Sequence, residues 1–380
     1  MKREDLERLQ RPYTLSEAKD PERLARALGV RTTAARELTL EIAGDLDPQR
    51  LGIGWWAPHP GTTSRILISD YLYMAADGIA TNLLEAAYHL AEAASAAEDE
   101  GRRWVAGVVA DPRGNIRLEH PVPTCAEDDL VDLRRSAHVV GCVRALASVL
   151  DCLAAAAVGV LAVPVQIFKV KYRVLIKDHL RRMAGDGLQA REAQQLVAAI
   201  DGAGPAGWDL WVLAYRNMLV HRGRRMWMSQ LLPTGGGLVA PRGDTLFSPY
   251  VVPQLPNEPG RSDVEVLRDG AEQSFMLSEN GWRTLEGALR STNDLVDAAA
   301  AILLGAWRAR KANPDALKQP REQWPKPKPQ DDDSGAFAGY QPGSVPMDLG
   351  QLHANPLFLK RLQAAALDDA QRQKWAAFDW

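Results

Sequence analysis

The stretch Trp208-Asp-Leu-Trp-Val-Leu-Ala-Tyr-Arg-Asn-Met-Leu-Val-His-Arg-Gly-Arg-Arg-Met-Trp227 decides how the rest of the chain is interpreted. Its apolar residues recur at every third or fourth position, which predicts a helix. At about 100° per residue, one apolar stripe consists of Trp208, Trp211, Val212, Tyr215, Leu219 and Met226. The opposite side carries Leu210, Leu213 and Val220, so this helix has two apolar faces.

A helix with two apolar faces needs a packing partner for each of them. We expect one face to lie in a bundle formed by the chain itself. We expect the other face to contact a second copy of the chain, because a monomeric bundle leaves it partly exposed. The sequence therefore predicts a homodimer.

The same periodicity predicts long helices at 69–98, 129–163 and 277–312, besides 207–228 itself. Four helices of this length can form an up-and-down bundle. The predicted fold class is therefore mainly α, an up-and-down helical bundle. A β-hairpin pattern with a central turn, followed later by proline-rich segments typical of strands and loops, predicts insertions into this bundle.

These patterns divide the chain into four regions. They are an N-terminal mixed region (1–65), the helical bundle with an insertion at about 230–276 (66–312), a proline-rich linker (313–346) and a helical tail (347–380).

Three local segments carry their own expectations. The alternation in Glu37–Ala43 favours a strand, and the run Glu98–Gly101 is expected to end the helix before a hairpin over 103–119. Pro164 predicts a break in the helix that precedes it. After that break, Val165–Met183 fits either a helix or a strand.

Composition narrows the class of protein. The 380 residues are 46% hydrophobic and 24% charged, which is typical of a soluble globular protein, and the formal net charge of -3 argues against coating nucleic acid. Three cysteines without CxxC spacing indicate reduced thiols in a cytoplasmic protein. The uncharged segment 152–168 favours a buried core helix over a membrane span, because it is rich in Ala and Gly and contains Pro164.

Three polar residues set into the second face of the 208–227 helix suggest chemistry: Arg216, Asn217 and His221. Asn217 and His221 are four residues apart and share one side of the helix. Two other Arg–His pairs have similar spacing. Arg113 and His120 span a predicted turn, and in the pair Arg173 and His179 the arginine is followed by the apolar Val174. Neither pair combines a helix with a polar residue after the arginine.

The pattern Arg216-Asn217-x-x-x-His221 resembles the R-x(4–6)-H signature of HEPN-domain proteins, in which a polar residue often follows the arginine. The resemblance covers roughly residues 129–228 and 277–312. It implies a metal-independent endoribonuclease of the kind found in toxin–antitoxin and antiviral defence systems, with an active site formed by two protomers. It also implies RNA as substrate and an antitoxin or defence-system partner.

The residue types fit cleavage of RNA without a metal. Histidine can transfer protons near neutral pH, arginine can stabilise a developing phosphorane charge, and asparagine can orient the phosphate or the imidazole. We find no phosphate-binding loop, zinc-protease motif or metal-ligand cluster in the sequence, so we expect neither cofactor nor metal. Beyond His221, the residues Arg222, Arg224 and Arg225 are candidates for RNA binding or form a solvated helix end.

Asp151, an acid in an apolar helix, is a candidate supporting residue. It can pair with Arg216 or His221, or form a structural salt bridge with Arg144 or Arg135. A structural reading of the motif also stays open, in which Asn217 and His221 bond to each other and Arg216 pairs with an acid. The alternative function is a non-catalytic helical module that binds RNA or protein or acts as a scaffold.

Overall fold

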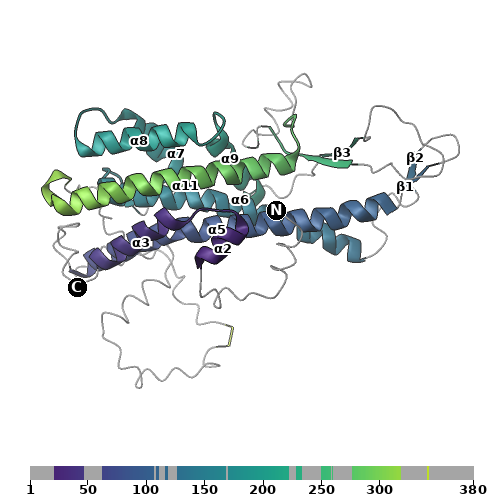
Figure 1. Cartoon of the computed structure of the whole chain (residues 1–380), viewed down its shortest axis with the longest axis horizontal. Coiled ribbons are helices and arrows are strands. Elements are labelled where there is room, and N and C mark those ends of the chain that lie inside the picture. The colour runs from purple at the N-terminus through teal and green to yellow at the C-terminus, as the bar shows by residue number, and fades with distance from the viewer. Residues whose placement is uncertain are drawn as a thin grey trace. The chain divides into compact units, whose positions relative to one another are not determined.

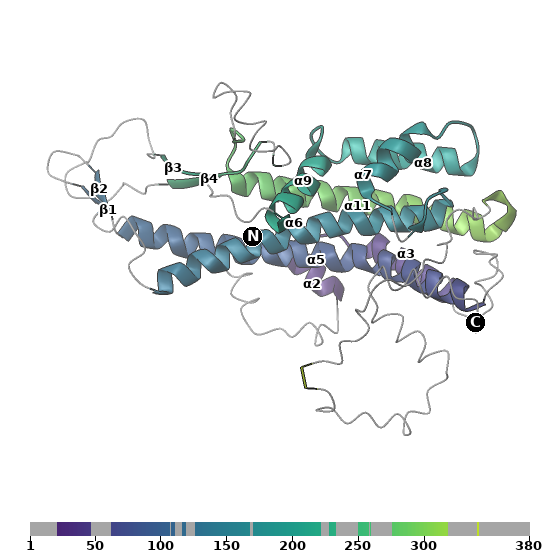
Figure 2. The same cartoon turned by 180° about the vertical axis from the view of Figure 1, so that it is seen from behind.

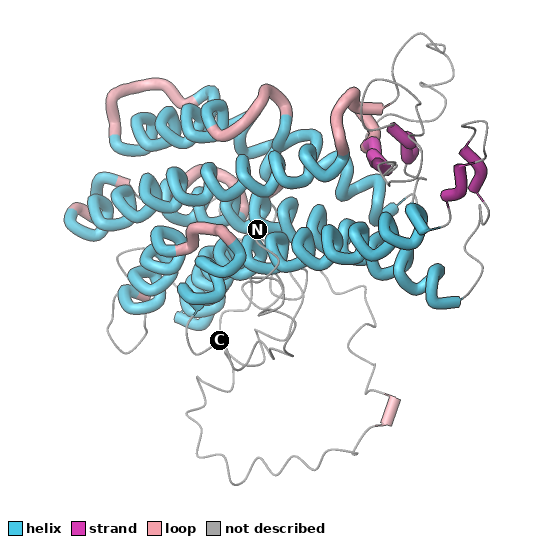
Figure 3. Tube along the Cα trace, turned by 45° about the vertical axis from the view of Figure 1, so that its right-hand side comes forward, coloured by secondary structure: helices cyan, strands magenta, loops and turns pink. Residues whose placement is uncertain are grey.

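The structure is a computed structural model. It describes residues 21–46, 62–106, 108–110, 116–118, 126–167, 170–221, 228–232, 250–257, 259, 276–317 and 340–341. These residues are mostly helical (Figure 1; Figure 3), so the predicted mainly α class is confirmed. The predicted linker and tail lie outside the described residues, apart from residues 313–317 and 340–341 of the linker.

The described residues form the α-helices α2 (Pro21–Leu28), α3 (Thr33–Asp45), α5 (Thr62–Ala106), α6 (Ala126–Leu161), α7 (Tyr172–Val174), α8 (Leu188–Gly202), α9 (Trp208–His221) and α11 (Gly281–Ala312) (Figure 1). A π-helical turn, Leu175–His179, and a 3-10 turn, Leu180–Arg182, follow α7. Another 3-10 turn, Pro314–Ala316, follows α11.

Among the described residues, four short strands form two antiparallel pairs. Strands β1 (Val108–Ala110) and β2 (Ile116–Leu118) pair with Val109 opposite Arg117. Strands β3 (Met228–Leu232) and β4 (Tyr250–Gln254) pair with Gln230 opposite Val252, and lie side by side in Figure 2.

The chain divides into two compact units. Unit 1 comprises Met1–Arg36, Gly78–Leu153 and Gln195–Ala301, and unit 2 comprises Glu37–Asp77, Ala154–Gln194 and Ile302–Trp380. The helices that contribute residues to both units are α3, α5, α6, α8 and α11.

Glycine permits a very close approach of α5 and α6 in unit 1. A Cβ atom added at Gly78 would lie 2.7 Å from Cys152 Sγ, and one at Gly141 would lie 2.8 Å from ring atoms of His89. Since 78 faces 152 and 89 faces 141, the two helices are antiparallel here.

The same kind of contact occurs within unit 2. A Cβ atom added at Gly159 of α6 would lie 2.6 Å from Leu72 Cδ1 of α5 and 3.1 Å from Ile167 Cδ1. Leu72 and Ile167 are fully buried, so neither side chain has free space beside it. Glycine at 159 is therefore a packing requirement.

The carboxyl end of α6 is buried in unit 2, and its carbonyl groups still find donors. Ala162 adopts a left-handed conformation with φ of 54°, and Val163 N donates to Val158 O. Arg310 Nη1 donates to Gly159 O at 2.9 Å and to Val160 O at 3.1 Å, while the side chain of Gln189 donates to the Leu161 and Ala162 carbonyls. These bonds satisfy the acceptors that a helix end leaves free.

Residues Glu37–Ala43 form part of helix α3, so the predicted strand is wrong. In a strand Leu38, Leu40 and Ile42 would share one face, but Leu40 is 72% exposed while Leu38 and Ile42 are fully buried. Burial follows the four-residue spacing of Leu38 and Ile42 instead, which is helical.

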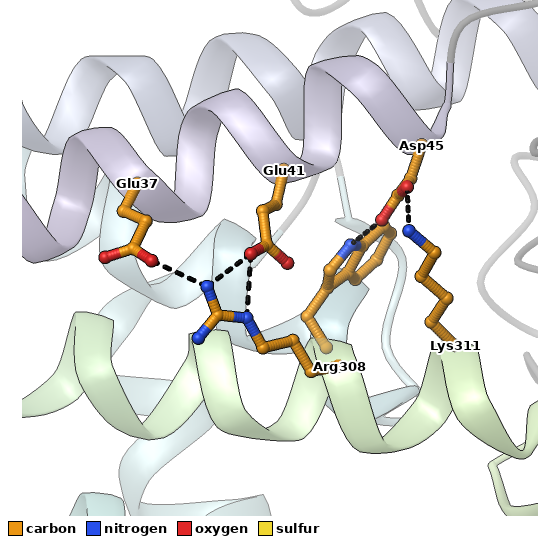
Figure 4. A network of polar contacts seen from close by, with 6 residues as sticks. Glu37, Glu41, Asp45, Arg308 and Lys311 are labelled. Carbon is orange, nitrogen blue, oxygen red and sulfur yellow. Dashed lines mark hydrogen bonds and ion pairs between the residues drawn. The ribbon is translucent and has the colours of Figure 1, made fainter.

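The polar side of α3 faces α11 within unit 2 (Figure 4). Arg308 Nη2 donates to Glu37 at 2.6 Å and also bonds Glu41, one turn further along α3. Asp45 accepts from Trp307 Nε1 at 3.0 Å and forms an ion pair with Lys311. The four-residue spacing of the three acids thus matches a row of donors on α11, and their ion pairs weaken with salt.

Two predictions for the first half of the chain differ from the structure. Helix α5 continues through Gly101 to Ala106, so Glu98–Gly101 does not end it. A single glycine costs a helix only about 1 kcal/mol, and acids at 98 and 99 precede arginines at 102 and 103 by four residues, a favourable helical spacing. The described residues of Val165–Met183 form neither one helix nor a strand, and contain α7 and two short helical turns.

The two later helices are shorter than predicted. Helix α9 ends at His221, and Met228 begins β3 instead of ending the helix. Helix α11 begins at Gly281 and not at 277, because Asn280 Oδ1 accepts from Trp282 N and so caps the helix.

Within the described part of the chain, one helix is long and apolar enough to cross a membrane, Asp129–Leu161 in α6. In its most apolar window, 67% is buried inside the protein. The core helix of a soluble protein meets the same criterion of length and composition, so this finding alone is weak evidence for a membrane span.

Substituting Gly159→Val is expected to destabilise unit 2 by about 1–3 kcal/mol, because the added atoms overlap Leu72 and Ile167. The matched control is Gly305→Val, since a Cβ atom at Gly305 of α11 meets nothing within 4 Å. Urea denaturation followed by circular dichroism measures both variants. Equal stability of the two would contradict the close approach of α5 and α6.

Candidate functional site

Helix α9 has one buried face and one exposed face. The buried face contains Val212, Tyr215 and Met218, each no more than 3% exposed. On the opposite side Leu210 is 43% and Val220 48% exposed. Asn217 lies between these two residues on that side and is also exposed.

The start and the buried face of α9 are held by specific contacts in unit 1. Gly207 has a φ of 82°, a left-handed conformation that glycine adopts without strain, and Trp208 N donates to Pro205 O. Trp211 Nε1 donates to Pro256 O at 3.0 Å, and its ring packs on Tyr215 with centroids 5.0 Å apart. These contacts orient the helix, and with it the exposed Asn217.

Arg216 pairs with Asp151 of α6. Arg216 Nη2 lies 3.2 Å from Asp151 Oδ2, and the two side chains are 33% and 40% exposed. The structure thus brings together Arg216 and its predicted supporting acid. Of the two other arginines considered for Asp151, Arg135 bonds Asp132 on its own helix.

A second nitrogen of Arg216 is more enclosed. Its Nε is buried, with no hydrogen-bond partner among the residues that the structure describes. The guanidinium therefore lies at the edge of the exposed face, with one end bonded to a carboxylate and the stem inside.

His221 is the last residue of α9, four positions after Asn217 and therefore on the same side of the helix by backbone geometry. The structure describes the backbone of His221 but not its side chain. Arg222, Arg224 and Arg225 lie outside the described residues.

A pair of histidines in unit 1 is not among the residues that the sequence pattern singled out. Nδ1 of His138, on α6, lies 2.9 Å from Nδ1 of His89, on α5. Tyr88 packs beside both rings, and Arg134 bonds Glu92 at 2.5 Å one turn away. His89 and His138 are 49 residues apart in sequence, so the pair can be recognised only when the register between α5 and α6 is known. The one signal in the sequence is Gly141 near His138, because glycine marks a close contact between helices.

The described residues include no group of three or more His, Cys, Asp or Glu side chains arranged to hold a metal ion. Cys142 and Cys152 are free thiols, and burial raises the pKa of Cys142 to about 12. Cys152 is half-buried beside Asn82, whose side chain bonds Gly78 O at 2.7 Å.

Comparison with models of protein families, with curated proteins and with solved structures finds no match to this chain. The HEPN resemblance therefore stays a prediction that depends on the motif in α9.

A double-mutant cycle tests the pairing of Arg216 with Asp151. With Arg216→Gln and Asp151→Asn, we expect a coupling free energy of about 0.2–1 kcal/mol, because both side chains are partly exposed and solvent screens them. Unfolding in 1 M salt should reduce this coupling. A coupling of zero at low salt would show that the pair does not form in solution.

Proposed function

We propose that the chain is a metal-independent endoribonuclease of the HEPN type, cleaving RNA at Arg216, Asn217 and His221. The observation that supports it best is the exposed face of α9, on which the polar Asn217 lies between Leu210 and Val220. His221 follows Asn217 by one helical turn. A role as a toxin or antiviral defence effector belongs to the same proposal.

In the proposed reaction the 2′-hydroxyl of RNA attacks the adjacent phosphorus and the 5′-oxygen leaves. His221 transfers a proton in this step, since imidazole titrates near neutral pH. Arg216 stabilises the negative charge that develops on the phosphorane, and Asp151 holds the guanidinium in position. Asn217 orients the phosphate, and Arg222, Arg224 and Arg225 bind the RNA backbone.

A homodimer is the second part of the proposal. Leu210 and Val220 are apolar residues with 43% and 48% of their surface exposed on one side of α9. Covering this face with a second copy would remove apolar surface from water and bring two Asn217 side chains to one interface. A dimer supplies two histidines, one to act as base and one as acid.

The alternative is a non-catalytic module that binds RNA or protein through the same face. The Arg216–Asp151 pair favours it, because a guanidinium already bonded to a carboxylate is less available to a phosphate. An RNA phosphate must then compete with Asp151 for Arg216. The two functions differ in one observable, the cleavage of bound RNA.

His221→Ala is expected to reduce RNA cleavage by about 10²–10⁴-fold, the usual contribution of a positioned proton-transfer group. Arg216→Ala should have a similar effect, and Asn217→Ala a smaller one, because water can replace an orienting amide. A fluorescent RNA oligonucleotide in EDTA measures the rate, with 2′,3′-cyclic phosphate as the expected product end.

His179→Ala is the matched control for these variants, since His179 lies in the π-helical turn after α7, away from the motif in sequence. Activity that survives His221→Ala would refute the proposed mechanism. Binding of RNA without cleavage by the wild type would favour the non-catalytic module. Unfolding of His221→Ala would support the structural reading of the motif.

Replacing both Leu210 and Val220 by Glu is expected to convert the dimer to a monomer in sedimentation velocity and to reduce cleavage with it. Both residues are exposed in the single chain, so the fold should persist. Leu40→Glu, at a leucine on α3 that is 72% exposed, is the matched control. A wild type that sediments as a monomer at micromolar concentration would contradict the dimer.

A further inference from the structure

We propose that His89 and His138 form a proton-sensitive contact between α5 and α6 in unit 1, which breaks when both imidazoles are protonated. The proposal is independent of the ribonuclease proposed for α9, since neither histidine belongs to that site. It assigns a regulatory role to two residues that the sequence pattern left without one.

The geometry sets the number of protons that the contact can hold. The two Nδ1 atoms lie 2.9 Å apart, with ring centroids at 5.2 Å and an angle of 50° between the ring planes. At this distance one Nδ1 must carry a hydrogen and the other must offer its lone pair. The two rings therefore have opposite tautomers.

A first added proton leaves the bond intact. It binds Nε2 of the donor ring, which becomes an imidazolium and still donates from Nδ1. A second proton has only the accepting Nδ1 left to bind, so it removes the acceptor. Two positive rings in contact then repel each other. The pair titrates as one system in two steps, and the second step breaks the contact.

The charged groups around the pair act in both directions. Burial is the largest effect and lowers the pKa of both histidines, and the positive charge of His89 lowers the pKa of His138 further. Glu85 and Glu92 of α5 favour the protonated form of His89, and Glu92 also favours that of His138, while Arg134 of α6 disfavours it. The net direction is downward for both, so the two rings resist protonation while they remain packed.

Packing decides where the rings can go. A Cβ atom at Gly141 would lie 2.8 Å from three atoms of the His89 ring, so this ring already rests on the backbone of α6. It cannot retreat further toward α6. Relief of the repulsion therefore requires the rings to turn toward solvent or α5 to separate from α6 locally.

The sign of the pH effect follows from linkage. Both histidines have a pKa below 6.5 in the folded chain, so the unfolded chain binds more protons between that lowered value and 6.5. The contribution of this pair to the free energy of unfolding is fully present above about pH 6.5 and is lost as the pH falls through this window.

Hydrogen–deuterium exchange from about pH 7.5 to about pH 5 tests the proposal on the full chain, with rates corrected for the intrinsic effect of pH. The equilibrium constant for opening at the amides of residues 85–92 and 134–142 should increase by up to tenfold per unit decrease in pH for each proton taken up. Buffers contain EDTA, because paired imidazoles also bind transition metals.

The variant His138→Gln separates the effect of the second imidazole from the effect of the nearby carboxylates. The glutamine oxygen can accept from a protonated His89, so the variant should lose most of the acid-induced opening while Glu92 and Arg134 remain. His179→Gln is the matched control and should behave as the wild type. Equal acid sensitivity in His138→Gln and the wild type would overturn the proposal.

If His138→Gln fails to fold, the wild type alone still decides. In a chain labelled at its histidines, NMR should resolve two coupled titrations, the second with its midpoint below pH 6.5. Two independent titrations at or above the ordinary value would exclude a shared proton and overturn the proposal.

Discussion

The close approach of α5 and α6 is the constraint on which the other features depend. Helices this near to each other need glycine or alanine at the contact, and Gly78, Gly141 and Gly159 supply it. In unit 1 the polar pair His89–His138 exists only because the ring of His89 can lie on the backbone at Gly141. The antiparallel contact also sets the position of Asp151, which holds Arg216 of α9.

Burial of the carboxyl end of α6 has a cost that the chain offsets inside unit 2. Carbonyl groups removed from water need donors, and Arg310 and Gln189 provide them across four successive residues. Burial lowers the pKa of Arg310 to about 10, yet its charge lies at the negative end of the α6 dipole. An apolar helix can therefore end inside the protein without unsatisfied carbonyl groups.

Helical periodicity predicted α5, α6, α9 and α11, because each buries an apolar face whose spacing is visible in the sequence. It failed at α3, where Leu38, Leu40 and Ile42 alternate by chance and only burial shows that Leu40 faces solvent. The pairing of Asp151 with Arg216 was one of several options, since charge alone does not choose among arginines. The pairing of His89 with His138 was not predictable, because periodicity predicts each helix by itself and does not give the register between two helices.

The contact between α3 and α11 imposes an order on folding. Arg308 bonds Glu41 and Glu37 across separations of 267 and 271 residues, so almost the whole intervening chain must be made before α3 meets its partner. Contacts this distant in sequence form slowly, because closing the loop costs chain entropy before the contact contributes any stabilising free energy. During synthesis the acids of α3 stay without their partners on α11 until Lys311 has emerged, and a nascent chain is open to aggregation or to a chaperone in this period.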